Sequence, residues 1–301
     1  MVAPAAPAPL PLTTRLAGFV ALTKPRIIEL LLVTTVPTMI VAEGGLPSVW
    51  LMVATVIGGT LAAGGANAIN MVVDRDIDAR MERTKGRPLV TGVVTAREAL
   101  VFAVGIEALA FVWLALLVNL VSALLALAAC LFYVFVYTLW LKRSSSQNIV
   151  IGGAAGAVPV LIGWSSVTGT VSVTAWLLFG VIFFWTPPHF WALAIRYRDD
   201  YAGVDVPMLP VVADDRSTVR QMVAYAVVVL GLSVAAGFTG SLGILYLLIA
   251  GVGGVAFVWS CADLLRNAEA SRAMRVFTYS IWYLSALFLG MAVDVLVRNG
   301  L

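Results

Sequence analysis

The stretch NMVVDRDIDARMERTKGRP, residues 70–88, is the point where a long apolar run gives way to a dense group of charges. It holds four acidic and five basic residues, in a chain of 301 residues that is 61% hydrophobic and only 12% charged. This composition is typical of a polytopic membrane protein and excludes an ordinary soluble domain. The chain is uncharged or nearly so over residues 27–73, 99–141, 144–195, 221–262 and 276–293.

These five apolar stretches predict nine transmembrane helices. One span needs about 20 residues, so each of the first four stretches can hold two helices. Each of those four also has a turn signal near its middle, such as AEGGLPS at 42–48. We therefore expect an all-α membrane helical bundle, formed by a single domain over residues 16–301 after a flexible Pro/Ala-rich tail over residues 1–15. The predicted spans are 27–43, 50–73, 98–118, 122–141, 148–166, 172–195, 219–238, 242–262 and 276–297.

The basic residues lie on one side of this predicted bundle. Of the 19 Lys and Arg, all except Arg298 fall in the N-terminal segment or in the loops after predicted helices 2, 4, 6 and 8. The positive-inside rule assigns that side to the cytoplasm. We expect a multi-pass protein of the cell membrane with its N-terminus and charged loops in the cytoplasm and its C-terminus outside. The charge pattern is thus explained by topology, and nothing in it indicates nucleic acid.

Three oxygen-bearing side chains share one predicted helical face. Asn70, Asp74 and Asp78 are four residues apart, so a helix that continues out of the second span stacks them. Asp76 points away and is expected to pair with Arg80. Carboxylates this close at a membrane boundary repel each other unless a cation lies between them. Their oxygens suit Mg²⁺, which also bridges to phosphate. A solvated loop with internal salt bridges is the alternative, and the depth of Asn70 in the span favours the metal site.

The second long inner loop, residues 196–218, repeats these ingredients. Asp199 and Asp200 follow the predicted sixth span, with Arg196 and Arg198 beside them. Two acidic ends that face one cavity would hold a metal-bound diphosphate between them. The similarity of the two loops hints at an internal duplication, although chance explains it equally well.

Several motifs resemble a known family. The segment NMVVDRDID resembles the N-x3-D-x3-D signature of the UbiA superfamily of intramembrane prenyltransferases, whose nine-helix layout with two cytoplasmic Asp-rich loops is similar too. The similarity runs from about residue 22 to residue 215. Four segments resemble, more narrowly, the protoheme IX farnesyltransferase (heme O synthase) family: DRDIDARMERTKGRPL, YTLWLKRSSSQNIVIGGAAGAVPVLIGW, WTPPHFWALAI and VPMLPVV.

The resemblance implies an enzyme that joins the farnesyl group of farnesyl diphosphate to a vinyl group of heme B, with water, giving heme O and diphosphate. Heme B is then a substrate and Mg²⁺ the cofactor. The resemblance implies that Asn70, Asp74 and Asp78, with Asp199 or Asp200, hold Mg²⁺ and that the first three are catalytic. The departing diphosphate would leave an allylic cation in a pocket that apolar helices keep dry.

The resemblance also implies basic residues that neutralise the diphosphate. The superfamily has a Y-x3-K pair after its fourth helix, whereas Tyr137 and Lys142 are separated by four residues. This departure leaves open whether the two side chains face the same way. The second acidic motif of the superfamily, D-x3-D, is likewise absent, which leaves open which aspartate of the second loop is a ligand. The diphosphate-binding candidates are Arg83, Arg87, Lys142, Arg143 and Tyr137.

His189 is the only histidine of the chain and lies within a predicted span. A polar side chain there needs a partner. Two roles are equally open: contact with heme or ligation of its iron, and hydrogen bonding to backbone freed by Pro187 and Pro188, which should break or kink the helix. Trp185 and Trp191 flank the site and are candidates for stacking on the porphyrin, although packing is the commoner role of Trp in a span.

Other functions make different predictions. A transporter should carry charged groups near the middle of the bilayer, whereas the polar residues here gather at one face. A superfamily member that acts on an aromatic quinone precursor or another tetrapyrrole is the nearer alternative, and the segments TPPHFWALAI and NIVIGGAAGA favour heme. A structural subunit or heme carrier would tolerate loss of Asp74. The sequence leaves open the oligomeric state and whether a downstream heme A synthase is a partner.

Overall fold

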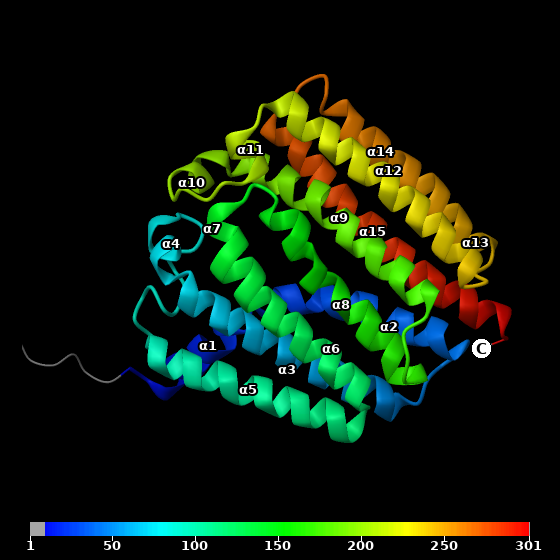
Figure 1. The fold of residues 1–301 in the computed structure, drawn as a ribbon, viewed down its shortest axis with the longest axis horizontal. Helices are drawn as coiled ribbons and strands as arrows, with labels where there is room; N and C mark the ends of the chain where they lie inside the picture. Colours follow the sequence, from blue (N-terminus) through cyan, green and yellow to red (C-terminus); the bar gives the residue numbers. More distant parts are fainter. Residues whose placement is uncertain (1–9, 301) are drawn as a thin grey trace, which may run out of the picture.

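Every element in the described part of the chain is helical. The structure is a computed structural model that describes residues 10–300, without the side chains of residues 26–32. The helices lie side by side in one bundle (Figure 1). In chain order they are α1 (Leu12–Leu22), α2 (Pro25–Glu43), α3 (Val49–Val73), α4 (Arg75–Arg80), α5 (Ala96–Leu117), α6 (Leu120–Leu131), the π-helix η1 (Phe132–Leu141), α7 (Lys142–Ser144), α8 (Asn148–Thr168), α9 (Val173–Arg196), α10 (Arg198–Ala202), α11 (Leu209–Val212), α12 (Asp215–Thr239), α13 (Ile244–Leu248), the π-helix η2 (Ile249–Gly253), α14 (Gly254–Asp263) and α15 (Ala270–Arg298).

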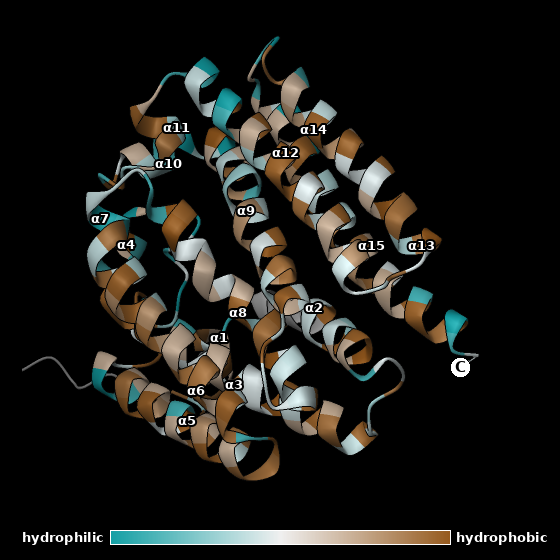
Figure 2. Cartoon of the chain, turned by 45° about the vertical axis from the view of Figure 1, so that its right-hand side comes forward, coloured by the Kyte–Doolittle hydropathy of each residue, from teal (hydrophilic) through white to brown (hydrophobic). Residues whose placement is uncertain are grey.

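Eight continuous helices within residues 10–300 are long and apolar enough to cross a membrane, so the predicted count of nine is wrong by one. The difference is the predicted span 27–43, which lies in α2. Among the described side chains, the apolar stretch of α2 covers only Val33–Glu43. The prediction of an all-α membrane bundle is confirmed, and Figure 2 shows mostly hydrophobic residues along the long helices, with hydrophilic residues gathered near their ends.

The predicted N-terminal tail overlaps the first helix. Helix α1 begins at Leu12, whereas the tail was expected to extend to residue 15. Residues 1–9 of that tail lie outside the described residues. Helix α1 packs against α3 and α5, so the helical part of the chain starts before the expected domain boundary.

Short polar motifs set the tight turns between long helices. Gly44 and Gly169 end α2 and α8 in the left-handed conformation, each with φ of 68°, which glycine adopts without steric cost. The hydroxyls of Ser48 and Ser172 then accept hydrogen bonds from the first turns of α3 and α9, and Asn119 does the same for α6. Such caps satisfy backbone donors that a helix start leaves unpaired.

Helix α9 lies at the centre of the packing, in contact with α8, α12 and α15. The largest apolar core forms around it and includes the fully buried side chains of Trp191 and Phe288. Helices α2 and α8 approach closely at Gly163, where an added Cβ would lie 2.6 Å from the carbonyl oxygen of Thr35. The core therefore holds the long helices at fixed positions, from which the polar loops extend.

One end of the bundle, which we call the loop end, carries α4, α7 and α10 (Figure 1). The chain finishes at the opposite end, where α15 ends. Two loops far apart in the sequence meet at the loop end through an apolar cluster that includes Ile77 and Met81 from the first loop and Val204, Val206 and Met208 from the second. This cluster brings both acidic loops together.

Candidate active site

The helical hydrogen-bond pattern continues across the junction between α3 and α4. The Asp74 amide donates to the Asn70 carbonyl at 2.9 Å, and the Asp78 amide donates to the Asp74 carbonyl at 2.8 Å. Asn70, Asp74 and Asp78 therefore lie on one helical face, as their spacing predicts. All three side chains are buried, and Asp74 has no exposed surface. Asn70 Nδ2 donates to Asp74 Oδ2 at 2.7 Å, which links the first two.

Each buried carboxylate has a cation of its own. Lys142, at the start of α7, forms an ion pair with Asp74. Arg87, from the loop after α4, contacts Asp78 through Nη1 and Oδ2 at 2.6 Å. A charge buried without a partner is strongly destabilising, so these pairs explain how two carboxylates can remain inside the bundle. Two of the predicted diphosphate-binding cations thus converge on the acidic face.

Lys24 is a third cation at this site, and its role there was missed from the sequence. Its Nζ donates to Asn70 Oδ1 at 2.8 Å. Burial, together with the nearby Arg87 and Lys142 charges, lowers the pKa of Lys24 to about 7. Its backbone is left-handed with φ of 53°, a conformation that costs a non-glycine residue roughly 1–3 kcal/mol. The only sequence signal was a lysine beside Pro25 at the edge of an apolar run.

The π-helix η1 places Tyr137 and Lys142 on the same face. The Lys142 amide donates to the Tyr137 carbonyl, five residues back, and π-helical turns of this kind occur often at functional sites. The extra residue between Tyr137 and Lys142 is therefore absorbed by the wider turn. Gly152 makes room for the Tyr137 ring, because an added Cβ would lie 2.2 Å from it. Thr138, which was not predicted, accepts from Asn70 Nδ2 at 3.2 Å.

Arg143 lies at the outer margin of the site. It binds Asp76 with two hydrogen bonds, of 2.7 and 2.8 Å, so the predicted pairing of Asp76 with Arg80 is wrong. The Arg143 guanidinium is the main cause that lowers the pKa of Asp76 to about 2. Its Nη2 is also 3.9 Å from Asp74 Oδ1. Arg143 is 67 residues from Asp76 in the sequence, and it reaches Asp76 because η1 ends beside the start of α4.

One of the two aspartates of the second acidic loop contacts the first loop. Asp200 Oδ1 accepts from the Glu82 backbone amide at 3.1 Å, so Asp200 reaches the first loop. Asp199 is exposed. Arg83, also exposed, lies close enough to the Tyr201 hydroxyl to interact with it. Of the two aspartates that the sequence left open, Asp200 is the one that contacts the first loop, at the Glu82 amide.

The side chains that the structure describes contain no group of three or more His, Cys, Asp or Glu placed to hold one metal ion, so the predicted set of five ligands is not assembled. Two buried carboxylate oxygens, Asp74 Oδ1 and Asp200 Oδ2, nevertheless have no hydrogen-bond partner there. Unpaired carboxylate oxygens fit Mg²⁺, which binds few protein ligands and completes its shell with water and phosphate oxygens.

His189 is enclosed by aromatic rings. It stacks on Trp185 at 4.2 Å between ring centroids and on Phe277 at 4.4 Å. Its Nδ1 lies 2.7 Å from the Ser280 hydroxyl. Helix α9 runs through Pro187 and Pro188 without a break, so of the predicted break or kink the break is not observed. The polar partner of His189 is therefore a side chain of α15, not backbone freed by the prolines.

The two tryptophans that flank His189 in the sequence lie apart in space. Trp185 stacks on the imidazole, and its Nε1 donates to the Ser280 carbonyl at 2.9 Å. Trp191 instead packs against Tyr225 of α12, with 5.7 Å between ring centroids. The structure thus joins Trp185 to His189 and directs Trp191 into the core.

Comparison with known proteins gives matches over most of the chain. The model of the UbiA prenyltransferase family matches residues 31–285. A protoheme IX farnesyltransferase from Streptomyces avermitilis is 52% identical over 294 residues, which cover 96% of each chain. A protein of the same name from Clavibacter michiganensis subsp. michiganensis is 54% identical over 283 residues, covering 93% of this chain and 92% of the relative.

A similar fold is found among solved structures. A UbiA homolog from Archaeoglobus fulgidus, bound to GPP and Mg²⁺, aligns with a TM-score of 0.64 at 16% identity, covering 91% of this chain and 99% of that one. At this identity the likeness concerns the fold. Together with the family match, it agrees with the resemblance that the sequence motifs indicated.

Proposed function

The chain belongs to the UbiA prenyltransferase family, and from this premise we propose that it transfers the farnesyl group of farnesyl diphosphate to a vinyl group of heme B. The products are heme O and diphosphate, and water is consumed. The chain is a prenyltransferase of the membrane; the identity of donor and acceptor is the proposal. It is supported by the name that relatives about half identical to the chain carry over nearly their whole length.

The observation that carries the proposal is the pairing of buried carboxylates with cations at one end of an apolar bundle. Asp74 pairs with Lys142 and Asp78 with Arg87, while Lys24 contacts the linking amide of Asn70. These cations come from three separate segments of the chain. A diphosphate that entered between them would exchange carboxylate contacts for phosphate contacts without leaving any cation unpaired. Arg143, Arg83 and Tyr137 would extend the anion site at its margin.

No three acidic side chains of the described residues already surround one ion, so Asp74, Asp78 and Asp200 would hold Mg²⁺ once the ion and the diphosphate draw them together, with Asn70 orienting Asp74. The bound metal would supply charge neutralisation at the leaving diphosphate. Lys142 and Arg87 add fixed positive charge that costs no reorganisation when the C–O bond breaks, and Lys24 would add to it when the bound diphosphate favours its protonated form. Asp199 is left out of the proposed ligand set because its side chain is exposed.

The bond between C1 of the farnesyl group and the diphosphate oxygen breaks, and the diphosphate takes the electron pair. The terminal vinyl carbon of heme forms the new C–C bond with C1, and water adds to the other vinyl carbon and loses a proton. The apolar helices around the site keep other water from the allylic cation.

We propose that His189 contacts heme B, the farnesyl acceptor, and that Trp185 holds the imidazole ring in place. The Ser280 hydroxyl has one proton and lies 2.7 Å from the Phe277 carbonyl as well as 2.7 Å from His189 Nδ1. When the hydroxyl donates this proton in a hydrogen bond to the carbonyl, its oxygen accepts a hydrogen bond from His189 Nδ1. His189 then keeps a lone pair on Nε2. Nε2 is then the atom that would meet heme, and Trp185 fixes the ring. Trp191, in the core, would support α9 and not stack on porphyrin.

We further propose that the loop end faces the cytoplasm and that the protein resides in the cell membrane. The basic residues gather at that end, as the positive-inside rule requires. The C-terminus lies at the opposite end of the bundle (Figure 1). A reporter fused to the C-terminus should then be accessible from outside the cell.

The proposed function is tested by incubating the purified protein with heme B, farnesyl diphosphate and Mg²⁺. We expect a porphyrin product whose mass has increased by one farnesyl group and one hydroxyl group. Conversion of an aromatic quinone precursor, with heme B left unchanged, would contradict the proposed acceptor. His189→Ala should weaken heme binding while farnesyl diphosphate binding is retained, and unchanged heme affinity would overturn the role of His189.

A further inference from the structure

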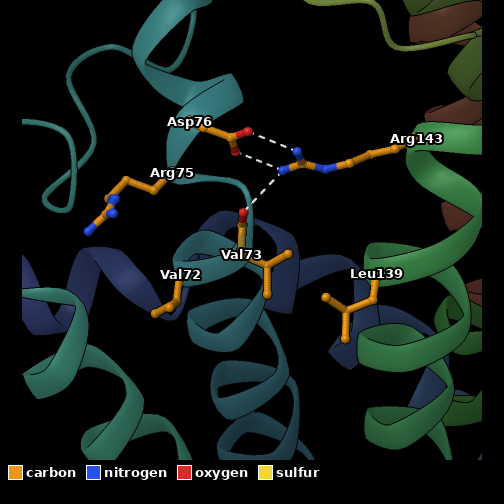
Figure 3. Close-up of a pocket in the computed structure, with 6 residues that line it drawn as sticks. All are labelled: Val72, Val73, Arg75, Asp76, Leu139 and Arg143. Carbon is orange, nitrogen blue, oxygen red and sulfur yellow. Dashed lines mark hydrogen bonds and ion pairs between the residues drawn. The ribbon is translucent and has the colours of Figure 1, made fainter.

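A hollow of about 400 Å³ opens on the surface of the bundle between the end of α3 and the end of η1. Figure 3 shows Arg143 reaching across to Asp76, while Arg75 points away on the other side. The buried Asp74 and Asp78 do not line the hollow, which adjoins the candidate active site and shares Arg143 with its outer margin. The lining residues are Val72, Val73, Arg75, Asp76, Leu139 and Arg143.

The hollow carries a net positive charge with unused donors. Arg75 is exposed and makes no hydrogen bond or ion pair within the side chains that the structure describes. Arg143 makes three hydrogen bonds, two to Asp76 and one to the Val73 carbonyl. Because a guanidinium has five N–H donors, Arg143 can still donate to an added oxygen. Asp76 neutralises only one of the two arginines.

The remaining lining is apolar and lies where two candidate spans end. The span Val49–Val73 stops at the hollow, and Leu120–Ser144 stops beside it. Leu139 is 50% exposed and the neighbouring Trp140 is 64% exposed. Exposed Trp and Arg together at the end of a span are typical of the membrane–water boundary. The hollow therefore offers a charged part and an apolar part to the same ligand.

We propose that this hollow binds an anionic phospholipid, with its headgroup phosphate on Arg143, the exposed Arg75 side chain turning toward that phosphate, and the start of an acyl chain against Val72 and Leu139. Basic pockets between transmembrane helices bind anionic headgroups, and guanidinium groups match phosphate geometry. A phosphate dissolved in water would gain nothing from the exposed apolar side chains, whereas a lipid contacts both parts.

Such a lipid would also bear on the active site. Arg143 Nη2 is 3.9 Å from Asp74 Oδ1, so Arg143 stands between the hollow and the innermost carboxylate. A phosphate on Arg143 would hold this guanidinium in place from outside. The bound lipid is thus a support for the outer wall of the site and not a reactant.

The test uses the full chain in nanodiscs of phosphatidylcholine with and without phosphatidylglycerol, followed by native mass spectrometry of the released protein. We expect the wild-type protein to retain phosphatidylglycerol in preference to phosphatidylcholine. Arg75→Gln should weaken this retention about five-fold, the effect of one arginine near an anionic surface. Leu139→Ser should weaken it without a change in charge. The matched control is Arg80→Gln, which removes the same charge from the same short helix outside the hollow.

Each other outcome would overturn the proposal. Equal loss of lipid in Arg75→Gln and Arg80→Gln would mean a general effect of surface charge, and no loss in Arg75→Gln would leave the hollow without a role. Displacement of the lipid by inorganic phosphate would assign the hollow to a free anion. A dimer that dissociates in Arg75→Gln would assign it to a second copy of the chain. Thermal unfolding of each variant checks that retention is compared between folded proteins.

Discussion

The two acidic loops contain similar residues, yet the structure uses them differently. In the first loop Asp74 and Asp78 are buried and each is neutralised by a cation, Lys142 from α7 and Arg87 from the same loop. In the second loop Asp199 is exposed, and Asp200 is held by one backbone amide with its other oxygen unpaired. The first loop is therefore a preformed charge cluster, whereas the second is joined to it through a single polar contact and the apolar cluster between the loops.

This difference indicates a division of labour. A group whose charge is already balanced by fixed partners can bind a charged ligand by exchanging partners, with little rearrangement of the bundle. A carboxylate with one free oxygen can complete a metal shell but cannot assemble one alone. We therefore expect substitutions in the first loop to remove the reaction and substitutions in the second loop to modulate it.

The largest effect is expected for Asp74→Asn. Loss of the Asp74 charge from the candidate active site should lower kcat about 10²–10³-fold, which is the scale for removing one group that stabilises the transition state electrostatically in a water-excluded site. It also leaves Lys142, which is largely buried, without its partner, at a cost of about 3–5 kcal/mol of stability. Steady-state farnesyl transfer and thermal unfolding in detergent measure the two effects.

A double substitution separates these effects. Asp74→Asn with Lys142→Met removes both members of the buried pair, so stability should recover most of the loss while kcat stays at least as low as in Asp74→Asn. Activity that returns together with stability would mean that Asp74 serves only the fold, and the contrast between the loops would fail.

A smaller effect is expected for Asp78→Asn. The Asp78 carboxylate pairs with one cation, Arg87, whereas that of Asp74 contacts Lys142, Arg143 and Asn70, so stability should fall less than in Asp74→Asn. Activity should drop about 10²-fold because one candidate metal ligand is lost. An unfolding temperature lower than that of Asp74→Asn would reverse the order of burial that the structure gives.

Asp200→Asn should have a moderate effect. The amide oxygen can still accept from the Glu82 amide, so the contact between the loops survives while the negative charge is lost. We expect KM for farnesyl diphosphate to rise about 10-fold, one step of 1.4 kcal/mol, with a smaller change in kcat. Kinetics at several Mg²⁺ concentrations test this, because added metal should restore part of the loss.

Asp199→Asn is the matched control and should have the smallest effect. Its carboxylate is exposed, and substitutions at such positions usually change stability by less than about 0.5 kcal/mol. Activity within about two-fold of wild type is expected on the same ground. A loss as large as that of Asp200→Asn would show that both aspartates of the second loop act together, as the first loop does.

Most of the fold and one half of the site follow from local patterns in the sequence. Spans can be read from hydropathy because each backbone hydrogen bond in a membrane must be satisfied within its own helix. The face shared by Asn70, Asp74 and Asp78 follows from a spacing of four. Both signals are local, so neither requires knowledge of the tertiary packing.

The partners of those residues could not be predicted in the same way. Lys24 lies 46 residues from Asn70, and Lys142 lies 68 residues from Asp74, so only packing brings each pair together. The π-helix η1 changes the facing of Tyr137 by one residue, which regular helical periodicity does not anticipate. The exposed position of Asp199 likewise depends on how α10 is turned at the end of α9.

The central claim is that the paired charges of the first loop bind a diphosphate together with Mg²⁺. Isothermal titration of farnesyl diphosphate into the wild-type protein, with Mg²⁺ present and then with Mg²⁺ chelated, tests it most directly. We predict binding that weakens about 100-fold on chelation, because the carboxylates then repel the diphosphate. Equal affinity under the two conditions would contradict the account.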